Sequence, residues 1–277
     1  MFEISATNND SGRTLFKLLI KYLNNVPVSR IEKLFRKKDI KVNNSRKVSK
    51  DLIINENDEI VVYGINDIFK NTFKKVSFDL NILYEDDNIL LINKQAGVVV
   101  HGDEHSLDQQ VLSYLNYKQI DSFKPSHVGR LDKETSGIIL YAKNYASLVT
   151  LNASSSNFIK KYLFKSDFNE VYKEVELYFD KQNNKIKTSV KAKDGYKYAK
   201  TIFSIENNKQ IAQLLTGRKH QIRLSLKFLG KPIYGDMKYG GKKASRLMLH
   251  SYYLKFVGLS GNLSYLNNFE FYAPAKW

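Results

Sequence analysis

The hydrophobic pattern at the start of the chain predicts two helices. The first is carried by five apolar residues that recur every three or four positions: Leu15, Leu18, Leu19, Tyr22 and Leu23. The second is expected to open with Ser29 as its N-cap, because Ser29 followed three residues later by Glu32 is a capping-box pattern. Ile31, Leu34 and Phe35 then give this second helix an apolar stripe for a core to bury.

After these helices the spacing changes to the two-residue alternation of strands. Residues 39–42 alternate, Asn43 and Asn44 supply a turn, and residues 59–63 form a second strand-like run. Two helices and short strands in so short a stretch predict a small α+β unit, residues 1–63. Residues 64–80 hold few periodic apolar positions and are interpreted as a linker, so a second domain is expected over residues 81–277.

The second domain is predicted to mix strands and helices. It opens with a strand, a turn and a strand over residues 82–85, 86–88 and 89–93. Later strands are expected at residues 137–142, 200–205 and 211–215, and helices at residues 144–156 and 216–229. The order lacks the regular βαβ alternation of a doubly wound fold, so the expected class is α+β with a mixed or mainly antiparallel sheet.

Charge adds a candidate partner to this picture. The 277 residues carry a net charge of +16, and the first 50 hold 12 Lys and Arg against 4 Asp and Glu, a net charge of +8. Such a balance favours a polyanion, because basic side chains neutralise phosphates and release counterions. Few acidic residues are interleaved with these cations, so we interpret the second helix and the strand after it as an RNA-docking surface rather than a solvated face. Its candidate residues are Arg30, Lys33, Arg36, Lys37 and Lys41.

Composition also removes several classes of chemistry. The chain has no cysteine, which excludes disulfides, thiolate catalysis and cysteine-ligated metal sites, and its five histidines are scattered. No apolar run approaches the roughly 18 residues of a membrane span, and the N-terminus lacks the apolar core of a signal peptide. We therefore expect a soluble cytoplasmic protein with no metal and no membrane partner.

Three stretches carry candidate chemistry, and spacing alone leaves each of them open. Residues 127–140, HVGRLDKETSGIIL, place Asp132 on a polar loop before an apolar strand, where an Asp either caps the loop or reacts. Residues 215–223, LTGRKHQIR, place His220 and Arg223 on one face of a predicted helix start. They either stay on the surface or turn inward to pair with a carboxylate. Residues 158–163, FIKKYL, set Tyr162 in a strand-like run, where packing is the commoner role.

Taken in chain order, GRLDKETSG, KKYLF and TGRKHQIR resemble the signature motifs of the RluA/RluC/RluD family of RNA pseudouridine synthases. Upstream LLINKQAGVVVHG and downstream GKPIYGDMKYGG and RLMLHS resemble further segments of that family, and the N-terminal unit resembles an S4 RNA-binding domain. The likeness covers nearly the whole chain and is closest to the RluC-like enzymes of large-subunit ribosomal RNA. The chain departs from the family pattern at Gln95, Gly129 and Lys231, none of which matches a catalytic position.

The resemblance implies conversion of uridine to pseudouridine in RNA without a cofactor. Asp132 matches the essential carboxylate, Arg223 the arginine that pairs with it, and Tyr162 the tyrosine that can stack on uracil. A base in folded RNA must be flipped out before it can react, and Arg130 matches a residue that can fill the vacated place. Further RNA-contact candidates are Arg218, His220 and Gln221, of which the last two are also expected to support the loops around Asp132.

Two other functions stay open at this point. A non-catalytic RNA-binding factor in ribosome assembly, on the same fold, is the main alternative, although the intact Asp132, Tyr162 and Arg223 count against it. A glycosidase acting on nucleosides or glycans usually needs two carboxylates that flank the bond, and the basic balance favours RNA over a neutral sugar. The expected partner is 23S-type large-subunit ribosomal RNA, and the expected state is a monomer.

Overall fold

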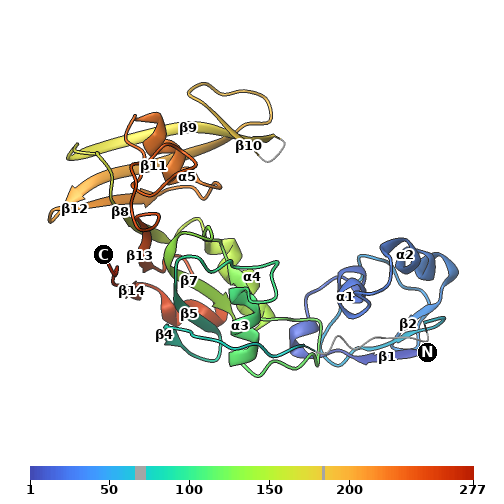
Figure 1. Ribbon diagram of the computed structural model, residues 1–277. Helices are drawn as coiled ribbons and strands as arrows, with labels where there is room; N and C mark the ends of the chain where they lie inside the picture. The colour runs from blue at the N-terminus through green and yellow to red at the C-terminus, as the bar shows by residue number, and fades with distance from the viewer. Residues whose placement is uncertain (66–72, 183–184) are drawn as a thin grey trace.

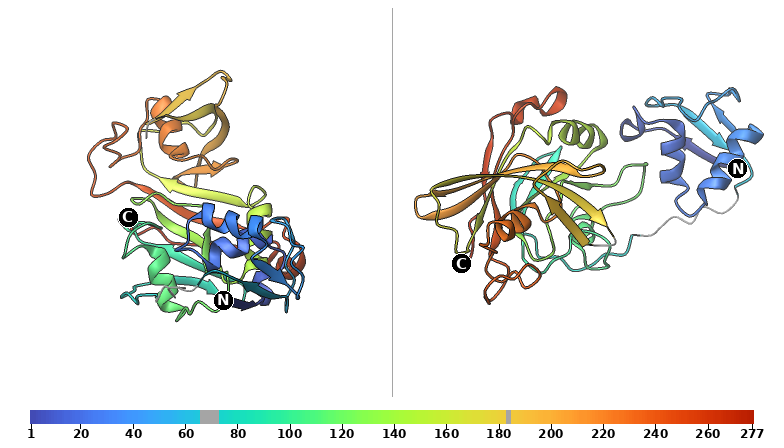
Figure 2. Two further views of the ribbon diagram at one scale, coloured as in Figure 1. Left: turned by 90° about the vertical axis from the view of Figure 1, so that its right-hand side faces the viewer. Right: turned by 90° about the horizontal axis from the view of Figure 1, so that it is seen from above.

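The computed structural model describes residues 1–65, 73–182 and 185–277, and it contains two units with separate cores (Figure 1). Part of the predicted linker, residues 66–72, lies outside the described residues. Seen from above in Figure 2, the N-terminal unit lies at one end of the molecule, beyond the large sheet. No helix among the described residues is long and apolar enough to cross a membrane.

The N-terminal unit packs two helices on a small antiparallel sheet. Its strands β1 (Phe2–Ser5), β3 (Glu59–Val62) and β2 (Ile40–Val42) lie in the order β1-β3-β2. A 3-10 turn η1 (Asn8–Asp10) precedes the helices α1 (Leu15–Tyr22) and α2 (Val28–Lys37). The apolar residues that predicted the helices are the ones that fill its core: Leu15, Leu18, Leu19, Leu23, Ile31 and Leu34.

The N-cap predicted for the second helix is wrong by two residues. The helix begins at Val28, with Pro27 in the N-cap position and Ser29 already inside. The Pro27 carbonyl accepts the backbone N–H groups of Arg30 and Ile31 at 2.9 and 3.2 Å. Proline suits a helix start because its φ is fixed near the helical value and its missing N–H needs no partner.

One large mixed sheet dominates the second unit. Nine strands follow the order β10-β9-β11-β12-β8-β13-β7-β5-β4, while β14 pairs with β13 and β6 pairs with β7. Among the strands that the structure describes, only the β13–β7 pair is parallel, so the predicted α+β class with a mixed, mainly antiparallel sheet is confirmed. The strands are β4 (Ile82–Glu85), β5 (Ile89–Lys94), β6 (Ser126–Val128), β7 (Ser136–Ala142), β8 (Ile159–Phe164), β9 (Tyr172–Gln182), β10 (Lys185–Ser189), β11 (Lys197–Glu206), β12 (Lys209–Leu214), β13 (Leu249–Lys255) and β14 (Glu270–Tyr272).

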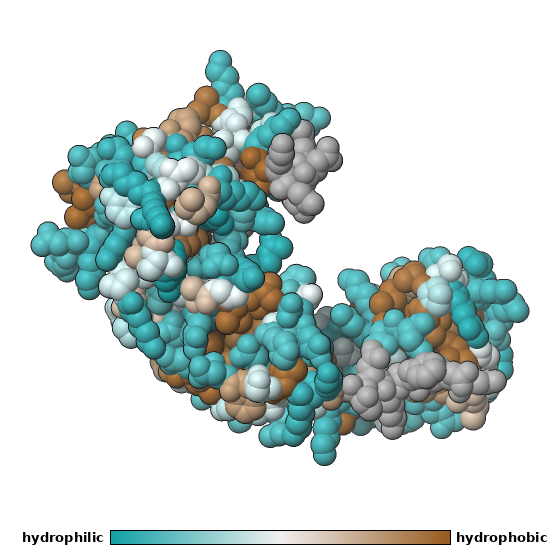
Figure 3. All heavy atoms as spheres, in the orientation of Figure 1, coloured by the Kyte–Doolittle hydropathy of each residue, from teal (hydrophilic) through white to brown (hydrophobic). Residues whose placement is uncertain are grey.

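Helices cover the sheet in two lobes. The helix α5 (Gln221–Phe228) packs in the core that contains β8, β9, β11 and β12. The helices α3 (Leu107–Tyr114) and α4 (Tyr145–Ser154), with the 3-10 turn η2 (Gly261–Leu266), pack in the cores around β5 and β7. Figure 3 shows the molecule hollowed on one side, between the N-terminal unit and the lobe that carries β9 to β12, with mainly hydrophilic side chains facing the hollow.

The two lobes meet where β7 and β13 run side by side, and this contact requires a glycine. Gly137 has a φ of +111°, and a Cβ placed there would come within 2.1 Å of the Ser251 carbonyl oxygen. Only glycine allows the two backbones to approach so closely. The loop that carries Asp132 feeds into β7 at this point, so the close contact fixes the position of that loop relative to β13.

Another difference from prediction lies at the start of α5. The periodic pattern predicted a helix from Thr216, but α5 begins at Gln221. The carboxamide oxygen of Gln221 accepts the Thr216 hydroxyl at 2.8 Å and the Arg218 backbone N–H at 2.9 Å. His220 has a φ of +57°. These contacts hold residues 216–220 as a turn, so tertiary hydrogen bonds override helix propensity.

Candidate active site

A cavity of about 670 Å³ lies between the two lobes of the second unit. Its walls come from the loop before β7, from β8 and β13, and from the turn that leads into α5. Each of the three stretches with candidate chemistry therefore lines the same space: Asp132 from the first, Tyr162 from the second, and His220 with Arg223 from the third. Pockets of this size are typical of small-molecule and nucleotide sites.

Asp132 is paired with Arg223 across 91 residues of sequence. Arg223 donates from Nη1 to Asp132 Oδ2 at 3.1 Å. The same guanidinium donates from Nε and Nη2 to the two oxygens of Asp236, at 2.7 and 2.8 Å. Asp236 is fully buried, whereas the Asp132 side chain is 25% exposed. The arginine is thus anchored on one carboxylate and presents its remaining nitrogen to the other, in the two-pronged geometry that guanidinium groups favour.

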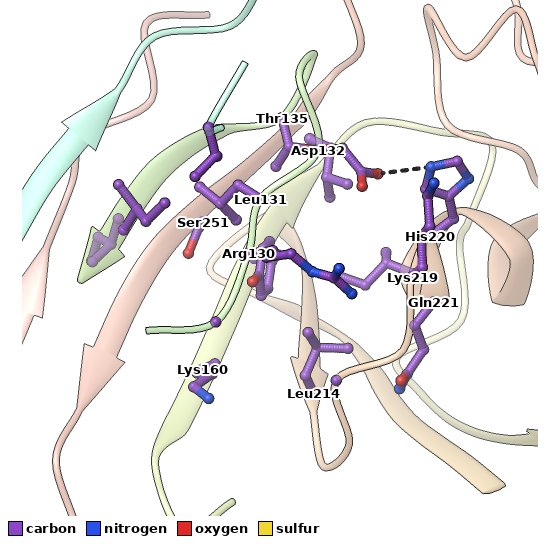
Figure 4. Close-up of a pocket in the computed structure, with 18 of the residues that line it drawn as sticks. Arg130, Leu131, Asp132, Thr135, Lys160, Leu214, Lys219, His220, Gln221 and Ser251 are labelled. Carbon is purple, nitrogen blue, oxygen red and sulfur yellow. Dashed lines mark ion pairs between the residues drawn. The ribbon is translucent and has the colours of Figure 1, made fainter. Parts of the chain in front are cut away.

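His220 approaches Asp132 from the other side of the cavity (Figure 4). Its Nε2 lies 3.6 Å from Asp132 Oδ2, and its Nδ1 lies 2.6 Å from the Tyr239 hydroxyl. Burial lowers the pKa of His220 to about 4, an effect that the Asp132 charge opposes and the Arg223 charge reinforces. The imidazole is therefore neutral at neutral pH. It contributes a positioned polar ring rather than a second cation.

The loop that carries Asp132 is held in place by Lys94, which is only 1% exposed. The Lys94 ammonium donates to the carbonyls of Gln95, Val98 and Lys133 at 2.9, 2.9 and 3.0 Å. The Gly97 backbone N–H also donates to the Lys133 carbonyl, at 2.9 Å. Burial lowers the pKa of Lys94 to about 8. Two donors thus converge on the carbonyl of Lys133, the residue after Asp132. They hold the loop so that the Asp132 carboxylate lies beside Arg223.

Tyr162 lies on β8 directly opposite Ser251 of β13, and it lines the cavity. Its side chain is almost fully buried. Burial raises the pKa of Tyr162 to about 12, and the Asp132 charge adds to the rise. The phenol is therefore neutral at neutral pH, and its ring offers a rigid apolar face inside the cavity.

The other residues predicted near the site divide into two kinds. Arg130 is exposed and extends into the cavity from the loop that carries Asp132 (Figure 4). Arg218 is exposed and donates from Nε to the Tyr198 carbonyl at 2.9 Å. Gln221 is 3% exposed, and its carboxamide nitrogen donates to the Lys200 carbonyl and the Thr201 hydroxyl. Because both ends of this buried amide are engaged, Gln221 supports the turn, and the RNA contact expected for it stays a prediction.

The predicted RNA-docking residues of the N-terminal unit lie outside this cavity. Four are exposed on α2 and the fifth is half-buried on β2: Arg30, Lys33, Arg36, Lys37 and Lys41. None of them lines the cavity around Asp132. Any joint action with the catalytic residues therefore requires a ligand large enough to touch both units.

Sequence reasoning assigned no role to three residues that build the site: Lys94, Asp236 and Tyr239. All three fall in stretches that resemble family segments, Lys94 in NKQAG and the other two in GDMKYGG. The signal was a charge inside an apolar or glycine-rich stretch, where an ion needs a partner. Among the described residues, no group of three metal-ligating side chains lies together.

Comparisons with known proteins agree on one family. A family model described as RNA pseudouridylate synthase matches residues 88–228. An uncharacterized RNA pseudouridine synthase of Mycoplasma capricolum subsp. capricolum is 38% identical over 289 residues, covering 97% of this chain and 96% of the relative. The ribosomal large subunit pseudouridine synthase C of Rickettsia felis is 38% identical over 254 residues, covering 81% and 79%. The structure of human RNA pseudouridylate synthase domain containing 1 has a TM-score of 0.57 at 21% identity, covering 71% and 84%, which shows a shared fold.

Proposed function

Because the chain belongs to the RNA pseudouridylate synthase family, we propose that its substrate is large-subunit ribosomal RNA and that Asp132 is its catalytic carboxylate. The protein is an enzyme that isomerises uridine to pseudouridine in RNA. In this reaction the bond from N1 to C1′ breaks and a bond from C5 to C1′ forms. C5 loses a proton and N1 gains one, so no atom is added to the nucleotide and no electron leaves it.

The pairing of Asp132 with Arg223, which is itself anchored on Asp236, is the observation that supports Asp132 most strongly. A carboxylate acts as nucleophile or general base in its ionised form, with at least one oxygen directed at the substrate. Arg223 engages Asp132 Oδ2 only, and Oδ1 accepts no hydrogen bond from any residue in the described parts of the chain. One oxygen is therefore held by the arginine while the other faces the cavity.

We propose that Tyr162 stacks on the flipped base and that Arg130 fills the gap that this base leaves in the RNA. A base must leave its stack before its C1′ and C5 can reach a side chain inside a cavity. The buried Tyr162 ring offers a stacking face beside Asp132, and its neutral phenol can exchange a proton near C5 late in the reaction. Arg130 extends from the same loop as Asp132, and its planar guanidinium suits the gap that the base leaves in the RNA.

We propose that residues 1–63 form an S4-like RNA-binding domain, residues 64–80 a linker and residues 81–277 the catalytic domain. The separate core of the N-terminal unit and its exposed cations on α2 support this division. The choice of large-subunit ribosomal RNA is supported by the relatives from Rickettsia felis and other bacteria, whose names state that substrate. The hollow in Figure 3 leaves room for folded RNA between the two units. We propose that the enzyme acts as a monomer, without a cofactor, and in the cytoplasm.

Mapping pseudouridines in ribosomal RNA from cells with and without the protein tests the proposal. We expect one or a few large-subunit uridines to lose the modification, and wild-type protein to restore it. Asp132→Asn, which is nearly isosteric but uncharged, should fail to restore it while binding RNA about as well as the wild type. Modification restored by Asp132→Asn would eliminate Asp132 as the catalytic group, and an unchanged ribosomal RNA would eliminate the proposed substrate.

A further inference from the structure

The two units of the chain share a polar interface that the linker alone does not explain. The Asn9 carboxamide donates to Asp121 Oδ2 at 2.9 Å and accepts the Tyr145 backbone N–H at 3.0 Å. The neighbouring Asp10 is fully buried and accepts the Ser122 backbone N–H at 2.9 Å. Each of these bonds joins residues more than a hundred positions apart in sequence. Directional bonds of this kind select one relative orientation of the two units.

Arg13 and Tyr22 complete this interface from the N-terminal side. The Arg13 guanidinium lies 3.6 Å above the centre of the Tyr145 ring, and the residue is only 8% exposed. The Tyr22 hydroxyl, at the end of α1, donates to the same Asp10 carboxylate at 2.9 Å. The interface therefore reaches the helices of the N-terminal unit. Figure 1 shows that unit beside the end of the catalytic unit that carries α3 and α4.

Docking leaves a groove of about 640 Å³ between the units. Both units contribute to its walls: Arg13, Lys21 and Asn24 from the N-terminal unit, and Gln109, Gln119 and Lys124 from the catalytic unit. Every one of these side chains can donate a hydrogen bond. A groove with this lining presents donors to whatever enters it, and only the docked arrangement brings the two sets together.

Two cations of this groove, Lys21 and Lys124, form no ion pair with any residue that the structure describes. The carboxylates of the groove are already engaged, since Glu104 pairs with Lys74 at 2.6 Å and Asp121 accepts the Asn9 amide. Unpaired ammonium groups beside amide donors match the oxygens of a sugar–phosphate backbone. Such contacts hold RNA in place without reading its sequence.

The groove is joined to the active site by β6, a strand of three residues. Ser126, the first residue of β6, lines the groove, while Val128, its last residue, lines the catalytic cavity. Asp132 follows four residues later. Six residues span at most about 20 Å even when fully extended. An RNA strand in the groove is therefore within a few nucleotides of the carboxylate.

We propose that this groove binds the RNA backbone beside the target nucleotide, and that docking through Asn9, Asp10 and Arg13 creates it. The proposal rests on the proposed function, because it assigns a second contact to the same RNA substrate. The N-terminal unit then forms one wall of a composite binding site, rather than acting as a separate RNA-binding domain joined only by the linker.

The first test removes the two unpaired cations in the variant Lys21→Gln/Lys124→Gln. The control, Lys242→Gln/Lys255→Gln, loses the same charge from lysines that are paired with Asp167 and Glu270 far from the groove. The probe is an unmodified transcript of large-subunit ribosomal RNA, titrated from low to high salt. Each lost phosphate contact reduces the slope of log Kd against log salt by about one, so we expect a reduction of about two for the groove variant. The effect on turnover should appear in KM, and the control should keep the wild-type slope.

The second test undocks the units with Asn9→Ala/Tyr145→Ala, which removes the bonds of Asn9 and the ring beneath Arg13 but leaves every residue that lines the groove in place. We expect RNA binding to weaken about as much as in the lysine variant, with circular dichroism unchanged. Wild-type binding and slope in this variant would show that docking does not build the site. Wild-type binding and slope in the lysine variant would show that the groove takes no RNA. Release of tritium from 5-tritiated uridine in the transcript separates the two proposals. If the wild type releases none, the proposed substrate fails, whereas release by the wild type with an unchanged lysine variant refutes the groove alone.

Discussion

Replacing Asp236 with Asn is the sharpest probe of the site, because Asp236 lies where no substrate reaches it. Its carboxylate is fully buried and accepts two hydrogen bonds from Arg223, at 2.7 and 2.8 Å. An Asn at this position keeps one acceptor but turns an NH₂ group toward the guanidinium. The substitution therefore removes the anchor of Arg223 while leaving Asp132 and the cavity walls in place.

The expected magnitude follows from the burial of the pair. Removing one partner of a buried ion pair costs about 3–5 kcal/mol, because the remaining charge loses its compensation. Arg223 retains Asp132 as a second partner at 3.1 Å, so we expect about 3 kcal/mol, the lower end of that range. Catalysis should fall as well, since a group misplaced by about 1 Å can cost on the order of 100-fold in rate.

Urea unfolding and single-turnover tritium release at saturating RNA measure the two effects of Asp236→Asn. The matched control is Asp167→Asn, which removes the carboxylate of an exposed ion pair with Lys242 and should cost less than about 1 kcal/mol. RNA affinity should stay within about twofold in both variants, because neither carboxylate faces the cavity. If Asp236→Asn unfolds like the control and turns over at the wild-type rate, the reasoning that Asp236 positions Arg223 is refuted.

Three further predictions concern the residues around Asp132. Lys94→Met leaves the Gln95 and Val98 carbonyls without the Lys94 donor and the Lys133 carbonyl with the Gly97 N–H alone, a cost that should outweigh the gain from no longer burying a charge. We expect the free energy of unfolding to fall by about 2–4 kcal/mol and kcat to fall with unchanged RNA affinity, and a fully stable variant would contradict the role of Lys94 in holding the loop. His220 has a pKa of about 4 when folded and 6.5 when unfolded, so the unfolded chain binds more protons between these values and stability present above pH 6.5 is lost as pH falls toward 4. Asn tolerates the left-handed backbone at this position, so His220→Asn is the matched variant. Between pH 7 and pH 4.5 its free energy of unfolding should fall by up to about 3 kcal/mol less than that of the wild type, measured by urea titration. An equal fall in both proteins would refute the assignment. Tyr162→Phe keeps the stacking ring but loses the hydroxyl, so RNA affinity should stay unchanged while loss of the C5 proton slows by about 100-fold. The slower step should appear as a larger isotope effect with C5-deuterated uridine. An unchanged isotope effect would show that the hydroxyl takes no part in that step.

Hydrophobic periodicity alone predicted much of the fold. The stripe from Leu15 to Leu23 became α1, and the alternating or apolar runs at residues 39–42, 59–63 and 89–93 became β2, β3 and β5 within one residue at each end. In these elements the apolar residues of the pattern are the ones that lie in the core, so local sequence and tertiary structure agree. The analysis of the pattern missed α3, β9 and β10, although Val175, Leu177 and Phe179 of β9 show the two-residue alternation of a half-buried strand.

The starts of two helices were wrong for reasons that periodicity does not contain. Pro27 places the N-cap of α2 two residues earlier than Ser29, and the side chain of Gln221 delays the start of α5 by five residues through its bonds to Thr216 and Arg218. The second case depends on a carboxamide that reaches back over its own turn. A hydropathy pattern records that Gln221 is polar, but not that it is buried and bonded to the residues before it.

The candidate site shows the same limit more clearly. Motif resemblance selected Asp132 and Arg223, which the structure brings to 3.1 Å, but it gave Asp236 no role. Asp236 follows a glycine in a turn, where an aspartate ordinarily caps the backbone. Its partner lies 13 residues earlier on a helix, so only the packing of α5 against that turn reveals that both of its oxygens are used.

The division of labour between the two carboxylates then follows from exposure rather than from residue type. Both touch the same guanidinium, but Asp236 is fully buried with both oxygens engaged, whereas Asp132 is 25% exposed and binds through one oxygen. A buried carboxylate with saturated oxygens has no lone pair left for a substrate, so it can only hold Arg223. Asp132 has an oxygen to spare and a cavity beside it. Arg223 therefore connects a fully bonded carboxylate to an incompletely bonded one, and this asymmetry is why we propose Asp132, rather than Asp236, as the catalytic group.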